Sequence, residues 1–185
     1  TNNILSPASG NPVVDPQLDL VLGLYYLTSM RHAVKGEGMS FATVNELLRV
    51  YDQDLVDLHA KVFVRVPMND DSGKLKLVET TPGRVILYTK VPNKLPFDMF
   101  NCTLKKKDVS NLVNECYRRC GVKDTVIFSD QIMYLGFEYA TKSGVSIGLD
   151  DIQVPENKQA LLDAGSKQVT NVYKQFNSGL ITRGE

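Results

Sequence analysis

The spacing of apolar residues along the chain predicts a mixture of helices and strands. Apolar side chains recur at helical intervals in residues 17–30, 41–53, 108–120 and 124–143. Residues 59–67 and 74–79 instead alternate between apolar and polar positions, which is typical of half-buried strands. Because a turn-forming Asp-Asp-Ser-Gly stretch separates the two alternating segments, we expect them to pair as a hairpin.

Residues that favour helix ends mark the borders of these segments. Ser40 is the expected N-cap of the helix over 41–53, and Thr81 followed by proline predicts the start of another helix that continues to residue 91. Asp108 is expected to begin the next helix, which closes at Gly121. The segment opened by Asp124 should end at Gly144, and residues 92–101 read as a loop packed by aromatic side chains.

The last part of the chain has a different character. Residues 145–149 predict a short strand, and Pro155 leads into a polar helix over about residues 156–178, too polar for a core element and expected to project. The expected fold class is therefore α+β: a small antiparallel sheet with several helices and a projecting C-terminal helical arm.

Composition narrows the class of protein further. The 185 residues suit one domain and an appendage, and 21 basic residues balance 21 acidic ones, which argues against a self-sufficient DNA-binding module. No apolar run approaches membrane-spanning length, and no secretory signal is visible. Three cysteines without framework spacing indicate reduced thiols and a cytoplasmic protein. Because the chain opens at Thr1 without methionine, we expect it to be a piece of a longer protein.

Two aspartate pairs are the first candidates for chemistry. Asp150 and Asp151 follow an apolar run, where one of them would suit a magnesium site with a distant partner, or both would bond to backbone N–H groups in a turn. Adjacent side chains in a strand point to opposite faces, which favours the turn. Asp70 and Asp71 are expected in the hairpin turn. We therefore predict no catalytic residue and no metal ligand in this chain.

Cysteines and basic residues give weaker signals. Cys116 and Cys120 lie one helical turn apart, but a zinc site would need ligands from Cys102, His32 or His59, so buried thiols are the favoured interpretation. Basic residues cluster at two places, which suits either phosphate binding or a solvated face: Lys105, Lys106 and Lys107, and Arg118, Arg119 and Lys123.

The segment after Asp124 has two distinct faces at 100° per residue. A polar and aromatic strip contains Ile127, Asp130, Gln131, Tyr134 and Glu138, with Lys123 at its start. An apolar face beside it contains Phe128, Ile132, Leu135 and Tyr139. The strip is either plain surface or a nucleotide contact, with lysine on phosphate and an apolar side chain against the base.

Several stretches together resemble a known family. They are "NNILSPASGNPVVDPQLDLVLGLYYLT", "KGEGM", "DLHAKV", "TTPGRVILY" and "DTVIFSDQIMYLGFEYATKSGVSIGLDDIQVPE". In this order they are similar to the largest subunit (β′) of bacterial DNA-directed RNA polymerase, with a proteobacterial character. The resemblance implies that residues 1–155 are the pore domain of the secondary channel and that residues 156–185 begin the funnel and rim helices.

The resemblance also implies a function in transcription without catalysis by this stretch. In the family, nucleoside triphosphates enter through the secondary channel and backtracked RNA leaves through it. The family's catalytic magnesium is held by an NADFDGD loop that does not occur here, so magnesium and zinc are expected outside this stretch. The implied partners are the β, α and ω subunits, the rest of β′, secondary-channel transcription factors, and DNA and RNA in the complete complex.

One site is implied residue by residue. In proteobacterial β′ a guanosine tetraphosphate (ppGpp) site lies at the junction with ω, and its motif matches Lys123, Ile127, Asp130 and Tyr134. The family's site has two further arginines upstream of Thr1, so we expect weak or no binding by this chain alone. Two alternatives remain open: an independent small-nucleotide-binding or protein-interaction module, and a metal-dependent phosphohydrolase using Asp150 or Asp151.

Overall fold

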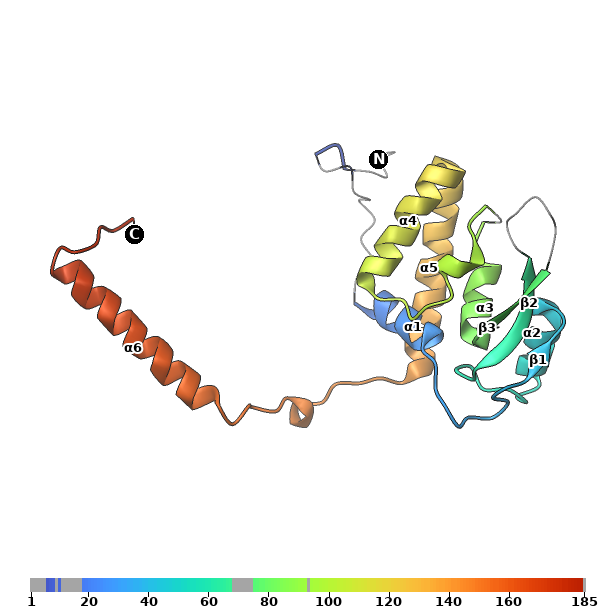
Figure 1. Ribbon diagram of the computed structural model, residues 1–185, viewed down its shortest axis with the longest axis horizontal. Helices are drawn as coiled ribbons and strands as arrows, with labels where there is room; N and C mark the ends of the chain where they lie inside the picture. Colours follow the sequence, from blue (N-terminus) through green and yellow to red (C-terminus); the bar gives the residue numbers. More distant parts are fainter. Residues whose placement is uncertain (1–5, 9, 11–17, 68–74, 93, 185) are drawn as a thin grey trace. The chain divides into compact units, whose positions relative to one another are not determined.

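The computed structural model describes residues 6–8, 10, 18–67, 75–92 and 94–184 (Figure 1). The chain divides into two compact units, Thr1–Val145 and Ser146–Glu185. Helices and a small sheet make up the first unit, and a single long helix dominates the second (Figure 1). This composition confirms the predicted α+β class.

Helix packing in the first unit centres on α5 (Val122–Ser143), which contacts both α1 (Asp19–Thr28) and α4 (Lys106–Cys120). The crossing of α1 and α5 is close because glycines meet there: a Cβ added to Gly23 would lie 1.8 Å from the Gly136 carbonyl oxygen. Helix α5 begins directly after Gly121 (φ +84°), two residues before the predicted start. Glycine tolerates this conformation, so it separates α4 from α5.

The three-stranded sheet has the order β1–β2–β3, formed by Ser40–Phe41, Val62–Pro67 and Leu75–Thr80. Strands β2 and β3 are antiparallel, with Val64 opposite Val78, as expected for the hairpin. Strand β1, however, runs parallel to β2, with Phe41 opposite Val64. The sheet is therefore mixed, and the prediction of a purely antiparallel sheet was wrong. A two-residue strand has no alternation that could reveal it in the sequence.

Two short helices cover the sheet. Helix α2 (Val44–Asp52) is capped by Thr43, whose side chain accepts the Glu46 N–H at 3.2 Å, so Ser40 is not the N-cap but part of β1. Helix α3 (Pro82–Thr89) begins as predicted, with the Thr81 hydroxyl accepting the Arg84 N–H at 3.4 Å. A short 3-10 helix, η1 (Phe97–Met99), follows α3.

The buried apolar side chains form two clusters. One lies among α1, α3, α4 and α5 and contains the fully buried Phe100 and Phe128, whose rings meet edge-on with centroids 6.3 Å apart. The other lies between the sheet, α2 and α3, and contains Val62, Val64 and Leu47. Helix α3 contributes to both clusters, so the end of α3 is held at a fixed place beside α5.

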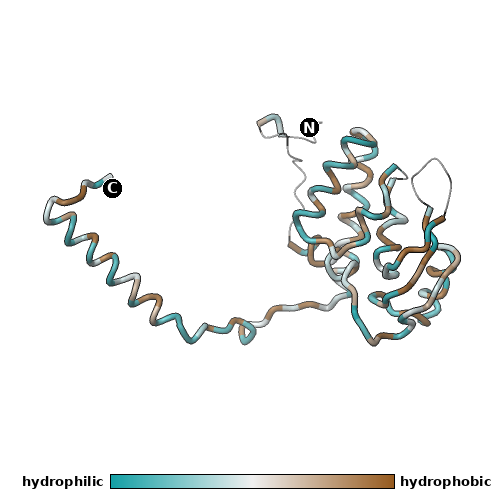
Figure 2. Tube along the Cα trace, viewed as in Figure 1, coloured by the Kyte–Doolittle hydropathy of each residue, from teal (hydrophilic) through white to brown (hydrophobic). Residues whose placement is uncertain are grey.

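The second unit has no comparable core. A 3-10 turn, η2 (Leu149–Asp151), precedes α6 (Lys158–Asn177), and every residue from 146 to 180 is exposed. The strand predicted over residues 145–149 is absent, so that prediction was wrong: Leu149 begins η2, and among the described residues no neighbouring strand pairs with 145–148. Apolar positions recur along the polar α6 (Figure 2).

Candidate functional site

The two predicted faces of α5 are present in the structure. The apolar face is buried, and its members are Phe128, Ile132, Leu135 and Tyr139. The strip is open to solvent: Tyr134 is 70% exposed and Ile127 47%, and Lys123 and Asp130 are also exposed. Large apolar side chains such as Ile127 and Tyr134 gain by contact with another molecule, because their present position leaves them in water.

Contacts on the buried side fix the orientation of the strip. The Thr125 hydroxyl donates to the Gly121 carbonyl oxygen at 2.8 Å at the start of the helix. Burial, with the nearby Tyr51 acting in the same direction, raises the pKa of Tyr139 far above its ordinary value, so this phenol stays neutral. Near the end of the strip Glu138 forms a 2.6 Å ion pair with Lys142. Glu138 is thereby engaged within the helix, one turn beyond Tyr134.

The remaining polar groups of the strip are uncommitted. Within the part of the chain that the structure describes, the side chains of Lys123, Asp130 and Tyr134 make no hydrogen bond or ion pair. They follow one another along one helix face in the order cation, apolar side chain, carboxylate, phenol, with Ile127 second. This order offers a phosphate contact at one end and a carboxylate that can accept N–H groups near the other.

A cleft of about 300 Å³ lies beside the strip. One wall is the end of α3 and the residues after it, and the other is the first half of α5; the lining residues are Thr89, Lys90, Val91, Pro92, Asp124, Ile127, Phe128 and Gln131. Ile127 belongs to both the strip and the cleft. Sequence reasoning missed the α3 wall because no local signal marks residues 89–92 as neighbours of a helix more than thirty positions later.

The aspartate pair in the second unit fits the turn interpretation. The Asp151 carboxylate accepts the Gly148 N–H at 2.8 Å and so closes the turn η2. Asp150 is exposed. Asp70 and Asp71 lie outside the described residues. Among the residues that are described, no group of three or more His, Cys, Asp or Glu side chains is placed to hold a metal ion.

The cysteines and histidines have separate surroundings. Cys116 is fully buried, which confirms the predicted buried thiol there, and burial raises its pKa to about 11. Cys120 is half-buried and Cys102 exposed. His59 is buried and donates from Nδ1 to the Ser29 carbonyl oxygen at 3.2 Å, whereas His32 is exposed and contacts Glu37 at 3.3 Å. These five side chains do not converge on one centre.

The basic clusters border solvent. Lys105, Lys106 and Lys107 are exposed at the start of α4, and Arg118 and Arg119 are exposed at its end. Arg119 donates to the Glu115 carboxylate at 3.1 Å, one turn earlier in the same helix. The end of α4 therefore has the charged face that an exposed helix commonly carries, with lysine or arginine near its negative end.

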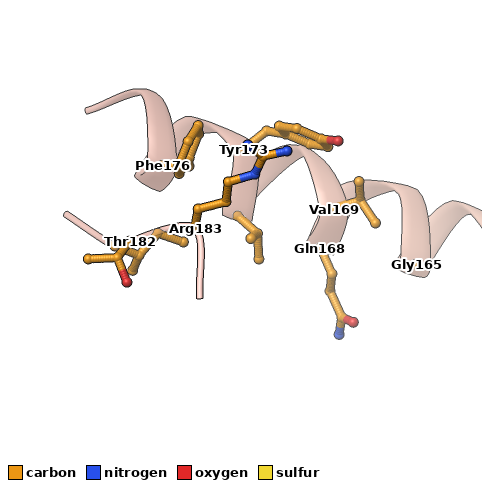
Figure 3. A pocket seen from close by; sticks show the side chains of 9 residues that line it. Gly165, Gln168, Val169, Tyr173, Phe176, Thr182 and Arg183 are labelled. Atoms are coloured by element: carbon orange, nitrogen blue, oxygen red, sulfur yellow. The ribbon is translucent and has the colours of Figure 1, made fainter. Parts of the chain in front are cut away.

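A hollow of about 900 Å³ lies along one face of α6 (Figure 3). Gly165, Val169, Val172 and Phe176 line it at alternating intervals of four, three and four residues. After α6 the chain turns at Gly179 (φ +74°), and residues 181–183 form the opposite side of the hollow. Spacing of this kind is the pattern by which one helix packs along another.

Within the described part of the chain, no helix is both long and apolar enough to cross a membrane.

Comparison with known proteins gives a consistent result over nearly the whole sequence. Residues 3–152 match the family model described as RNA polymerase Rpb1, domain 3.

Curated relatives are named DNA-directed RNA polymerase subunit beta'. Those of Stenotrophomonas maltophilia and Acinetobacter baylyi are 48% and 49% identical over all of this chain, and one from Pseudomonas aeruginosa is 48% identical. The chain spans only 14% of the length of each of these relatives.

Proposed function

This chain belongs to the family RNA polymerase Rpb1, domain 3, and on that premise we propose that it forms part of the wall of the secondary channel in a bacterial RNA polymerase. In this proposal residues 1–155 are the pore domain and residues 156–185 begin the funnel and rim helices. The whole enzyme, a cytoplasmic nucleotidyltransferase, carries out DNA-templated RNA synthesis. Nucleoside triphosphates enter past this segment, and backtracked RNA leaves past it.

The observation that carries the proposal is the similarity to β′ subunits over the whole of this chain, at 48–49% identity. The reacting magnesium, and the zinc of the complete subunit, belong to stretches outside this chain. The β, α and ω subunits, the rest of β′ and secondary-channel factors are the proposed partners, with DNA and RNA bound by the complete complex. The apolar face of α6 supports the rim assignment, since its spacing is suited to packing along another helix.

Crosslinking of RNA tests the channel assignment. A photoreactive group at the RNA 3′ end should react with residues 1–155 in backtracked elongation complexes and much less in complexes held in the forward register. If backtracked RNA reacts only with other parts of the polymerase, this segment does not line the exit path.

A second part of the proposal concerns regulation. We propose that Lys123, Ile127, Asp130 and Tyr134 form the β′ share of a guanosine tetraphosphate site completed by ω. Exposure of all four on one face of α5, with no internal partner for the three polar ones among the described residues, supports this role. Lysine suits a phosphate, and a carboxylate can accept the N–H groups of guanine.

Calorimetric titration of the polymerase with guanosine tetraphosphate tests this site. Tyr134→Ala should weaken binding about tenfold, a loss of roughly 1.4 kcal/mol. Tyr173→Ala is the matched control, because Tyr173 is similarly exposed (64%) but lies on α6. Equal affinities of the two variants, or tight binding by this chain without ω, would contradict the shared site.

A further inference from the structure

The cleft between α3 and α5 contains polar groups that the fold does not use. Lys90 and Asp124 face it from opposite walls, and Gln131 lies about two turns along α5 from Asp124. Among the described residues, none of these three side chains makes a hydrogen bond or an ion pair. Val91, Pro92 and Phe128 supply apolar walls. A few convergent polar groups on an apolar surface are typical of small-molecule sites.

The cleft lies beside the strip on the side of Ile127 that faces away from Lys123. At 100° per residue, Lys123 lies about 40° to one side of Ile127 around the α5 axis. Gln131 and Asp124 lie about 40° and 60° to the other side, toward α3. A ligand seated on Ile127 therefore has Lys123 on one flank and the cleft with Lys90 on the other.

We propose that Lys90 is a second cationic contact for the nucleotide that binds the α5 strip, and that it holds one of two diphosphate groups. The inference rests on the function proposed above. A guanosine carrying two diphosphates extends two charged arms from one ribose. With the ribose over Ile127, one arm reaches Lys123 and the other enters the cleft toward Lys90.

The two opposite charges in the cleft predict opposite effects on nucleotide affinity. Asp124 lines the same cleft, so its carboxylate repels a phosphate that Lys90 attracts. Removing the charge of Lys90 should therefore lower the affinity, and removing the charge of Asp124 should raise it. A plain structural role predicts something else: Lys90 follows the last turn of α3, where a cation favours the helix end, and its loss would lower thermal stability without changing affinity.

The experiment is a titration of the complete polymerase with guanosine tetraphosphate. We expect Lys90→Met to weaken binding about tenfold and Asp124→Asn to tighten it about threefold. Lys94→Met is the matched control, since Lys94 is also exposed but does not line the cleft, and it should bind as the wild type does. Melting temperatures of the variants separate loss of a contact from loss of structure.

Guanosine diphosphate, which has only one charged arm, sharpens the test. With it, only one of Lys90→Met and Lys123→Met should still weaken binding, whereas both weaken binding of the tetraphosphate. If Lys123 and Tyr134 variants lose affinity while Lys90→Met matches Lys94→Met, the Lys90 contact is wrong and the strip remains. If the wild-type polymerase binds no guanosine tetraphosphate, both proposals are overturned.

Discussion

Helices α5 and α6 are nearly equal in length, with 22 and 20 residues, yet they relate to the rest of the chain in opposite ways. Helix α5 buries six residues against α1, α4 and the aromatic cluster. Helix α6 buries none, although it carries Leu162, Val169, Val172 and Phe176 at helical spacing. Helix α6 is somewhat more polar than α5, but the larger difference is that its apolar face has no partner among the described residues of this chain.

The comparison shows which of the two helices is stabilised by packing inside this chain. Most helices in proteins owe their stability to packing of an apolar face, because isolated helices of this length are marginal in water. Helix α5 has that packing, and its free side remains available for a ligand. Helix α6 presents its apolar face to solvent, which is the property of a surface that meets another molecule.

Glycine substitutions should give the largest contrast between the two helices. Gly23→Val places a side chain where its Cβ would lie 1.8 Å from the Gly136 carbonyl oxygen, so α1 and α5 must separate. We expect a loss of roughly 4 kcal/mol or more in the free energy of unfolding. In Gly165→Ala of α6 the added Cβ meets no atom within 4 Å. This change should instead stabilise the helix, by about 0.5–1 kcal/mol of free energy.

Urea denaturation followed by circular dichroism measures both effects. The contrast holds if Gly23→Val unfolds at much lower urea and Gly165→Ala does not. A Gly165→Ala variant as destabilised as Gly23→Val would mean that α6 packs tightly within the chain.

Phenylalanine truncations should give the next largest difference. Phe128 is fully buried in α5 and Phe176 is 43% exposed in α6. Phe128→Ala should cost about 3–4 kcal/mol, since it leaves a cavity among Phe100 and its neighbours. Phe176→Ala should change the stability of this chain by less than about 0.5 kcal/mol.

The same pair of variants can be compared in the assembled polymerase. There Phe176→Ala should become costly if another helix covers α6, and thermal shift of the complex measures it. No change on assembly would show that the apolar face of α6 stays in water.

The spacing of apolar residues in the sequence correctly predicted the elements whose apolar face packs inside the chain. Helices α1 and α5 and the hairpin of β2 and β3 follow the sequence pattern, and Thr81 caps α3 as expected. The wrong predictions about strands share one cause. The direction of β1 and the absence of the strand predicted at 145–149 both depend on which strand lies beside them, which no local pattern encodes.

The candidate site divides along the same line. The strip on α5 could be predicted because its members are spaced along one helix, and their exposure agrees with that prediction. The cleft beside it could not, since it exists only where the end of α3 meets α5. No sequence feature distinguishes Lys90 from other surface lysines. Only its position in the fold, opposite Asp124 across the cleft, does so.

The smallest predicted effect is a dependence of stability on pH that belongs to the first unit alone. His59 is 2% exposed; its Nδ1 donates to the Ser29 carbonyl oxygen, and its Nε2 has no partner among the described residues. The Tyr26 ring packs against it at 4.6 Å between centroids. Burial lowers the pKa of His59, and the charge of Arg31 acts in the same direction, while Ser29 and Asp57 oppose the shift.

Because the folded state lowers this pKa, the unfolded chain binds the proton more readily. The contribution of His59 is therefore fully present above about pH 6.5, the ordinary value for histidine, and is lost as the pH falls below it. One such group changes the free energy of unfolding by at most roughly 1.4 kcal/mol per pH unit. Urea titrations between pH 7.5 and 5 should show that the free energy of unfolding depends less steeply on pH in His59→Gln than in the wild type. Helix α6 contains no histidine, so its helicity should stay constant over this range while the first unit weakens. Equal slopes in the wild type and His59→Gln would mean that other groups control the pH dependence of the first unit.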